Sequence, residues 1–333
     1  MISKIIEFSQ KKPLIFTFII LLVIFLIEFL ILITPISSKA KFPVIIEVNK
    51  SDNLSDFTNK LYNKRVINSK FNFKLTAKIL GLENKLKPGR YKITENHSYI
   101  GLVKYILRTS PEQPILFKIY QNSSLEKVIN SLQINLGYDK NILKQYLYDP
   151  SYLRNYGFNA KNAEGYILPM KYEFYKSDDI EYVLNKMLYT TKVFFQDSLG
   201  ISDPQKIHQI LTLSSIVQGE TNKIDEYPII AGVYWNRIKK NMPLQACPTV
   251  QYALKRDRWD KITFKDLQIN SPYNTYKHIG LPPGPIGSPS IQAIKATINP
   301  ANHNYLFFVA NGNGGHNFSE SYNQHLNFKK NAK

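Results

Sequence analysis

The pattern of hydrophobic and polar residues separates an apolar start from a longer part of mixed character. Residues 14–34 (LIFTFIILLVIFLIEFLILIT) form a run of 21 residues whose only charged side chain is Glu28. About 20 apolar residues span a bilayer core, whereas the apolar part of a signal peptide usually has about 7 to 15. The run therefore predicts one uncleaved transmembrane helix rather than a signal peptide cleaved near Ser38-Lys39-Ala40. Residues 1–13 then form a short N-terminal segment.

The next part of the chain predicts a small α+β module over residues 42–112. Residues 44–48 (VIIEV) are typical of a strand, and the helical spacing of Leu54, Phe57 and Leu61 follows a polar turn. The predicted order is strand, helix, helix, strand, helix. Strand, polar turn and helix return at residues 115–132, which indicates either a repeat or units common to any α+β domain.

Two helices with clear ends are predicted after residue 202. Asp203-Pro204 combines a capping side chain with a proline at the first helical position, and apolar residues recur from there to Gly219. A second helix opens at residues 225–228 and ends at Lys239-Lys240, with acid at its start and base at its end as the helix dipole favours.

The C-terminal part predicts an ordered loop and a strand. Residues 270–300 are rich in Pro, Gly and Ser with interleaved Tyr and Ile, which predicts an ordered loop. Residues 305–310 (YLFFVA) predict a buried strand, and the glycine-rich residues 311–315 predict a hairpin turn.

The net charge and the cysteine content argue against a nucleic-acid partner and an intramolecular disulfide. The 333 residues include 43 Lys and Arg and 25 Asp and Glu, a net charge of +18. The excess is spread along the chain, whereas nucleic-acid binding proteins gather it in one patch. No nucleic-acid partner is expected, and an anionic lipid surface or wall polymer suits the charge. Cys247 is the only cysteine, which excludes an intramolecular disulfide and predicts a buried or half-buried side chain.

Glu220 is the strongest candidate for chemistry. It lies three, four and seven residues after Val217, Ile216 and Leu213, so it extends the apolar stripe of its helix. Partial desolvation and the negative end of the helix dipole both favour the protonated acid there, which could donate a proton to a leaving oxygen. The alternative is a glutamate that turns to solvent at a helix end.

Other candidate residues carry weaker signals. Glu164, in Glu164-Gly165-Tyr166, is predicted to be structural rather than catalytic. The histidines near the C-terminus lack the spacing of a zinc helix, so no metal site is predicted. Tyr273 and Tyr276, with Asn274 between them, would suit either a sugar groove or core packing.

A series of motifs resembles one known family. In chain order, the series consists of Glu164-Gly165-Tyr166 with Pro169, and of residues 213–220 (LSSIVQGE), 230–237 (IAGVYWNR), 242–250 (MPLQACPTV), 271–276 (SPYNTY), 280–286 (GLPPGPI), 288–289 (SP) and 308–318 (FVANGNGGHNF). This ordered set, spread over about half the chain, is similar to the YceG-like family of endolytic murein transglycosylases (MltG).

The resemblance implies an α+β protein with three parts. It would have a single-pass helix at residues 14–34 with a cytoplasmic N-terminus, a LysM-like module at residues 42–112 and an extracytoplasmic (periplasmic) catalytic domain at residues 113–333. The implied reaction cleaves the β-1,4 bond between N-acetylmuramic acid and N-acetylglucosamine in nascent strands, leaves 1,6-anhydro ends and terminates elongation. Implied partners are peptidoglycan strands, lipid of the inner cell membrane and peptidoglycan synthases such as penicillin-binding proteins. No cofactor is implied.

The resemblance also assigns residues. Glu220 takes the place of the catalytic glutamate, acting as general acid and then as base. The substrate groove would be lined by Asn236, Arg237, Gln245, Thr249, Tyr273, Asn274, Thr275 and Tyr276. Gln218 stands where many relatives have a second acid, Cys247 where Asp is usual, and Met170-Lys171 where Asp-Thr is usual. These departures keep open the alternative of an inactive peptidoglycan-binding scaffold.

Overall fold

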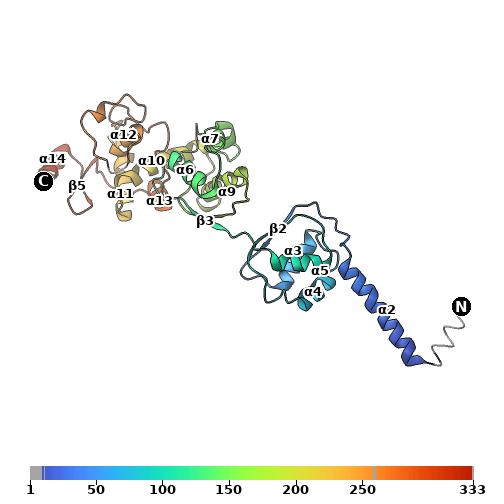
Figure 1. Cartoon of the computed structure of the whole chain (residues 1–333). Helices are drawn as coiled ribbons and strands as arrows, with labels where there is room; N and C mark the ends of the chain where they lie inside the picture. The colour runs from blue at the N-terminus through green and yellow to red at the C-terminus, as the bar shows by residue number, and fades with distance from the viewer. Residues whose placement is uncertain (1–9, 11, 258–259, 332–333) are drawn as a thin grey trace. The chain divides into compact units, whose positions relative to one another are not determined.

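The computed structural model of the protein describes residue 10, residues 12–257 and residues 260–331. Most of the predicted N-terminal segment, residues 1–13, lies outside the described residues. The packing of the chain divides it into two compact units, Met1–Pro114 and Ile115–Lys333 (Figure 1).

The first unit begins with the predicted apolar helix. Helix α2 (Pro13–Ile33) has 21 residues and a mean hydropathy of 3.2 over its most apolar window, so by length and composition it can span a bilayer. Most of its side chains are exposed, as a lipid-facing helix requires, but Leu32 in its last turn is buried.

The rest of the first unit confirms the predicted order of elements. These are β1 (Val44–Val48), α3 (Leu54–Asn63), α4 (Lys70–Ile79), β2 (Gly89–Ile93) and α5 (Tyr99–Arg108). The two strands pair antiparallel, with Val44 opposite Ile93. Asn53 begins α3 with a capping box, in which its side chain accepts from the Asp56 N–H and the Asp56 carboxylate accepts from the Asn53 N–H.

The second unit is mostly helical, with two small antiparallel sheets. Its elements are β3 (Ile115–Lys118), α6 (Leu125–Leu136), α7 (Lys140–Leu147), α8 (Pro150–Arg154), β4 (Lys171–Phe174), α9 (Ile180–Val193), η1 (Phe194–Ser198), α10 (Pro204–Glu220), η2 (Ile224–Glu226), α11 (Tyr227–Lys239), α12 (Cys247–Ala253), η3 (Asp266–Gln268), α13 (Ile291–Ile298), β5 (Phe307–Ala310), β6 (His316–Ser319) and α14 (Tyr322–Asn331). Strand β3 pairs with β4, and β5 with β6.

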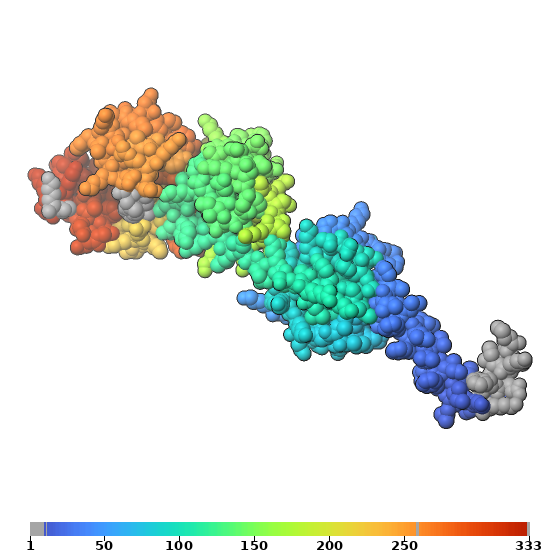
Figure 2. All heavy atoms as spheres, viewed as in Figure 1, coloured from blue at the N-terminus to red at the C-terminus, as the bar shows by residue number. Residues whose placement is uncertain are grey.

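Helix α10 passes through both hydrophobic cores of this unit. Ile207, Ile210 and Leu211 belong to the core built by β3, β4 and α6 to α9, whereas Ile216 and Val217 belong to the core built with α11 and α13. Figure 1 shows α10 between these two groups of helices, and Figure 2 shows their surfaces in green and in yellow to red. The helix is buried on all sides over its last three turns, so its C-terminal end is fixed by both cores.

The structure confirms some elements and corrects others. The predicted helices after residue 202 are α10 and α11, and residues 311–315 join β5 to β6 as a hairpin.

The predicted loop at residues 270–300 contains helix α13, which Ser290 caps by accepting from the Ala293 N–H. The predicted buried strand at residues 305–310 is shorter, and the first three residues of β5 are half-buried while Ala310 is exposed. The predicted second strand, turn and helix are β3 and α6, but β3 pairs with β4 after three helices, whereas β1 pairs with β2 after two.

Glu164 connects two segments of the second unit. Its carboxylate accepts from the Leu125 N–H at the start of α6, at 2.9 Å to Oε1 and 3.1 Å to Oε2, and the Tyr252 hydroxyl donates to Oε2 at 3.1 Å. Burial raises the pKa of the Glu164 carboxyl to about 7, although these donors oppose the shift. The contacts give Glu164 a structural role.

This pKa predicts a pH-dependent contribution to stability. In the unfolded chain the pKa of Glu164 has its ordinary value of 4.5, so between pH 4.5 and about 7 the folded protein binds this proton more tightly than the unfolded chain does. The free energy of unfolding should therefore fall as pH rises through this range. We expect the difference in free energy of unfolding between wild type and Glu164→Gln to change by up to about 3 kcal/mol over this range and to level off above it. Urea unfolding of the full chain in detergent across these pH values measures it. Glu173→Gln, an exposed glutamate on β4, is the control, and parallel profiles for all three proteins would contradict the prediction.

Candidate active site

Glu220 is the last residue of α10 and is half-buried. The hydroxyl of Tyr234, a buried residue of α11, donates to Glu220 Oε1 at 2.6 Å. Burial and the neighbouring Glu220 carboxyl raise the pKa of Tyr234 well above 10, so this hydroxyl keeps its proton and remains a donor. The sequence indicated Tyr234 only as an apolar helix position, so the structure adds this contact.

A groove of about 1360 Å³ runs beside the end of α10. Its walls include Lys118, Asn122, Lys127, Glu164, Gln251, Tyr252, Tyr273 and Ile286, together with Gly219 and Asn222 on either side of Glu220 in the chain. Gly219 is required at this point because a Cβ there would lie 2.6 Å from the Pro248 Cβ. Helix α12 can therefore pack closely against the end of α10.

Asn236 and Arg237 hold the chain around the site. The Asn236 amide donates to the carbonyls of His303 and Tyr305, and the Arg237 guanidinium donates to the carbonyls of Leu306 and Leu244 at 2.7 Å each. Burial lowers the pKa of Arg237, and attraction by Tyr234 and Glu220 opposes that shift. Arg237 thus supports the walls and also places a positive charge near the Glu220 carboxyl.

Three of the predicted groove residues lie inside the wall rather than on its surface. Thr249, Asn274 and Thr275 are fully buried. The hydroxyls of Thr249 and Thr275 lie 2.9 Å apart, and the Asn274 amide donates to the carbonyls of Leu267 and Ile269 at 2.9 Å. These contacts fix the loop of residues 271–276 against the start of α12.

Three further predicted groove residues remain accessible, whereas Arg237 is buried. Gln245 is exposed, and Tyr273 and Tyr276 are half-buried. Tyr273 packs on Tyr252 with ring centres 4.9 Å apart, and both rings line the groove. Aromatic faces of this kind suit the apolar faces of sugar rings.

Cys247 is exposed, which corrects the predicted buried or half-buried position. It is the first residue of α12, and its Sγ lies 3.1 Å from the Tyr276 hydroxyl. Desolvation of the sulfur and the nearby Glu220 raise the pKa of the thiol, which disfavours a reactive thiolate.

Gln218 is buried and holds a core position rather than the site. Its side-chain amide donates to the Tyr227 hydroxyl and accepts from the Ser290 N–H at 3.3 Å. Gln218 is therefore engaged with α11 and with the cap of α13.

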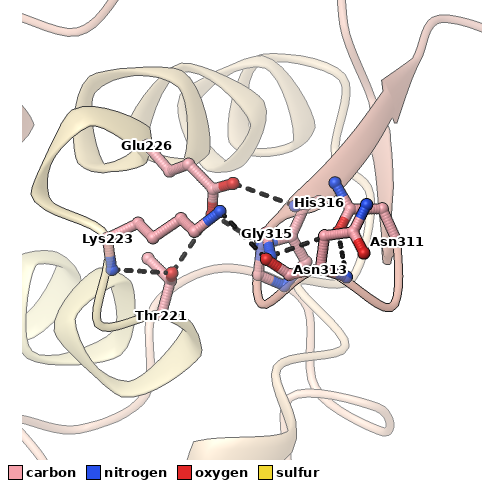
Figure 3. Close-up of polar contacts among 7 residues, drawn as sticks. All are labelled: Thr221, Lys223, Glu226, Asn311, Asn313, Gly315 and His316. Carbon is pink, nitrogen blue, oxygen red and sulfur yellow. Dashed lines mark hydrogen bonds and ion pairs between the residues drawn. The ribbon is translucent and has the colours of Figure 1, made fainter.

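The buried carboxylate of Glu226 links the β5–β6 hairpin by hydrogen bonds to the segment after Glu220 (Figure 3). Glu226 accepts from the His316 N–H at 2.9 Å, while its Oε2 lies 2.7 Å from His316 Nδ1 and accepts from the Thr221 hydroxyl at 3.1 Å. Burial favours a higher pKa for Glu226, but the His316 hydrogen bonds outweigh it and hold the pKa below its ordinary value. Lys223 also donates to the Asn313 carbonyl in the hairpin turn. No local sequence pattern indicated that this helix start and this turn meet.

Glu220 lies beside the groove, whose lining includes its chain neighbours Gly219 and Asn222 and also Glu164. Glu164 and Glu226, the buried carboxyl groups of the described part of this unit, both accept from backbone N–H groups and side chains that hold the fold together. Glu220 is half-buried at the end of α10, with the Tyr234 hydroxyl as a donor and Arg237 near its carboxyl group. These features are typical of a general acid and base.

Comparison with known proteins agrees with the motifs. Residues 46–331 match the profile of the YceG-like family. Endolytic murein transglycosylase of Bacillus subtilis strain 168 is 27% identical over 317 residues, covering 90% of this chain and 87% of that protein. The protein of that name from Streptococcus pneumoniae R6 is 26% identical over 307 residues, covering 83% of this chain and 56% of the pneumococcal protein.

A solved structure shares the fold. The crystal structure of a YceG-like protein from Listeria monocytogenes superposes with a TM-score of 0.57 and 28% identity, covering 85% of this chain and 98% of that one. With a family profile matched over most of its length, this chain belongs to the YceG-like family.

Proposed function

We propose that this protein is an endolytic murein transglycosylase that cleaves the β-1,4 bond between N-acetylmuramic acid and N-acetylglucosamine within nascent glycan strands. The observation that carries the proposal is Glu220 at the end of α10, held by Tyr234 beside a groove of about 1360 Å³. The names of the relatives support the same substrate.

In the proposed mechanism Glu220 acts twice. The Tyr234 hydroxyl donates to Oε1 and so orients the carboxyl group, which begins the reaction with its acidic proton. That proton passes to the glycosidic oxygen as its bond to C1 of the muramic acid breaks. The carboxylate then takes the proton of the 6-hydroxyl as the 6-oxygen closes on C1, which gives the 1,6-anhydro end and returns Glu220 to its protonated form.

This chemistry explains why one carboxyl group is sufficient. Glycosidases that use water need a pair of carboxylates, one as acid and one as base or nucleophile. Here the nucleophile is part of the substrate, so Glu220 can serve both steps. Arg237 lies close enough to interact with Glu220 electrostatically and would stabilise the carboxylate formed after the first proton transfer.

The proposed location follows from helix α2. With its N-terminus in the cytoplasm, the single span would hold residues 42–333 outside the cell membrane, where new strands are made. Cleavage there would terminate strand elongation, with peptidoglycan synthases as partners. The diffuse positive charge suits anionic lipid and the carboxylates of the wall polymer.

The first prediction concerns Glu220→Gln. Without a proton to donate, the variant should lose activity by about 10³-fold, the range expected for a general acid and base. Uncrosslinked glycan strands are digested with the full-length enzyme in detergent, and 1,6-anhydro ends are counted by mass spectrometry. Asp225→Asn, which removes an exposed carboxylate nearby, is the matched control. Wild type that forms no anhydro ends would favour the inactive scaffold, and an active Glu220→Gln would contradict the assignment of Glu220.

The second prediction concerns Tyr234→Phe. The change removes only the hydroxyl that orients Glu220, and hydrogen bonds to charged groups contribute about 1.5 to 3 kcal/mol. We expect kcat to fall about 10- to 100-fold with KM nearly unchanged, because substrate binding does not depend on this hydroxyl. Tyr189→Phe, at an exposed position of α9, should leave kcat unchanged. Equal kcat values for wild type and Tyr234→Phe would contradict the positioning role.

The third prediction uses the one cysteine as a topology probe. Cys247 is exposed, so a maleimide that cannot cross membranes should label it in intact bacterial spheroplasts. The raised thiol pKa favours labelling at mildly alkaline pH. Cys247→Ser is the negative control. Labelling that appears only after lysis would contradict the extracytoplasmic location.

A further inference from the structure

Helix α4 carries apolar side chains on two opposite faces. Phe73 and Ala77 are buried and pack in the core of the first unit. On the other side Phe71, Leu75 and Ile79 recur every four residues and are 69%, 36% and 70% exposed. Residues spaced by four lie on one helix face, so these three form a continuous apolar stripe at the surface.

A row of lysines borders this stripe. Lys70, Lys74 and Lys78 each precede one apolar residue, and the helix sequence KFNFKLTAKI contains no acid. Lys70 lies over the Tyr62 ring at 4.8 Å, and Lys74 donates to the Ser55 hydroxyl, so two of the lysines are held beside the helix. An apolar stripe flanked by lysines is typical of helices that lie in a membrane interface.

The apolar helix α2 is built into the core of the same unit. Leu32, in the last turn of α2, and Ile36 belong to the hydrophobic cluster that contains Phe73. The Ile36 N–H donates to the His97 carbonyl at 2.9 Å, and the Asn96 amide donates to the Ile36 carbonyl. No flexible linker therefore separates α2 from the module. A bilayer spanned by α2 would end directly against the module's surface.

Helix α4 lies where it could contact a bilayer spanned by α2. Helix α5 packs against the end of α2 and also against α4. Figure 1 shows α4 and α5 at the end of the module from which α2 leaves.

We propose that α4 docks on the surface of a bilayer rich in anionic lipid. Phe71, Leu75 and Ile79 enter the boundary between head groups and acyl chains, and Lys70, Lys74 and Lys78 contact the anionic head groups. This inference rests on the proposed membrane anchor, because α2 brings α4 to the surface. Lysines near an anionic surface are attracted to it, so the three lysines and the apolar stripe give the module a second attachment. Two attachments would limit its rotation about the axis of α2.

The test uses Phe71→Trp in the full-length protein reconstituted in vesicles. The emission of the two native tryptophans is removed by subtracting the spectrum of the wild-type protein. In vesicles of phosphatidylcholine with phosphatidylglycerol, we expect the emission of the new tryptophan to shift to shorter wavelength and to be quenched by brominated acyl chains. Ile134→Trp is the matched control, since Ile134 is an isoleucine 80% exposed on α6 of the other unit. This tryptophan should be neither shifted nor quenched.

The contribution of the lysines is tested in the same assay. Lys70→Gln with Lys78→Gln, both exposed, should reduce the quenching of Phe71→Trp several-fold in the anionic vesicles. Vesicles of phosphatidylcholine alone should give the same low quenching with or without these changes. Equal quenching in both lipid mixtures would overturn the role assigned to the lysines.

Flotation of the vesicles separates failure of the docking from failure of the anchor. Protein that floats with the vesicles but shows no more quenching at position 71 than at position 134 would overturn the docking of α4 and leave the anchor standing. Protein that does not float would overturn both. A shift in emission caused by glycan strands in detergent without lipid would assign the stripe to the polymer and overturn the membrane proposal.

Discussion

The hydrogen bond from Tyr234 to Glu220 connects two buried helices at the point where the proposed chemistry takes place. Its geometry depends on α10, which passes through both cores of the second unit and is buried on all sides as it approaches Glu220. A helix held in this way cannot shift without opening both cores. The carboxyl at its end therefore keeps its position relative to both walls of the groove, as a group that must transfer a proton requires.

The surrounding residues maintain that position with backbone contacts. Arg237 donates to carbonyls on both sides of the site, and the Gly219 contact with Pro248 brings α12 against the end of α10. Glu226 and His316 hold the β5–β6 hairpin to the segment that follows Glu220. Polar residues that look like substrate ligands in the sequence are thus largely engaged with the protein's own carbonyls. Tyr252 and Tyr273 line the groove together with the end of α10 at Gly219 and with polar side chains such as Lys118, Asn122 and Gln251.

The sequence predicted the features that depend on local order. The apolar run, the cap at Asp203 and the acidic start of α11 follow from neighbouring residues, so α2, α10 and α11 could be predicted. The stripe leading to Glu220 also predicted its half-buried carboxyl. Helix α13 was missed because only eight helical residues follow a loop rich in proline and glycine. Contacts such as Tyr234 with Glu220 and Glu226 with His316 join residues 14 and 90 positions apart, and no local pattern encodes them.

The central claim is that the substrate's own 6-hydroxyl, rather than water, attacks C1. Glu220 donates a proton to the glycosidic oxygen and then accepts the proton of the 6-hydroxyl. Cleavage of glycan strands in ¹⁸O-labelled water, followed by mass spectrometry of the new ends, tests this claim most directly. The mechanism predicts 1,6-anhydro ends that carry no ¹⁸O. Muramic acid ends that carry one ¹⁸O atom would show that water is the nucleophile, and would contradict the account of a single acid serving both steps.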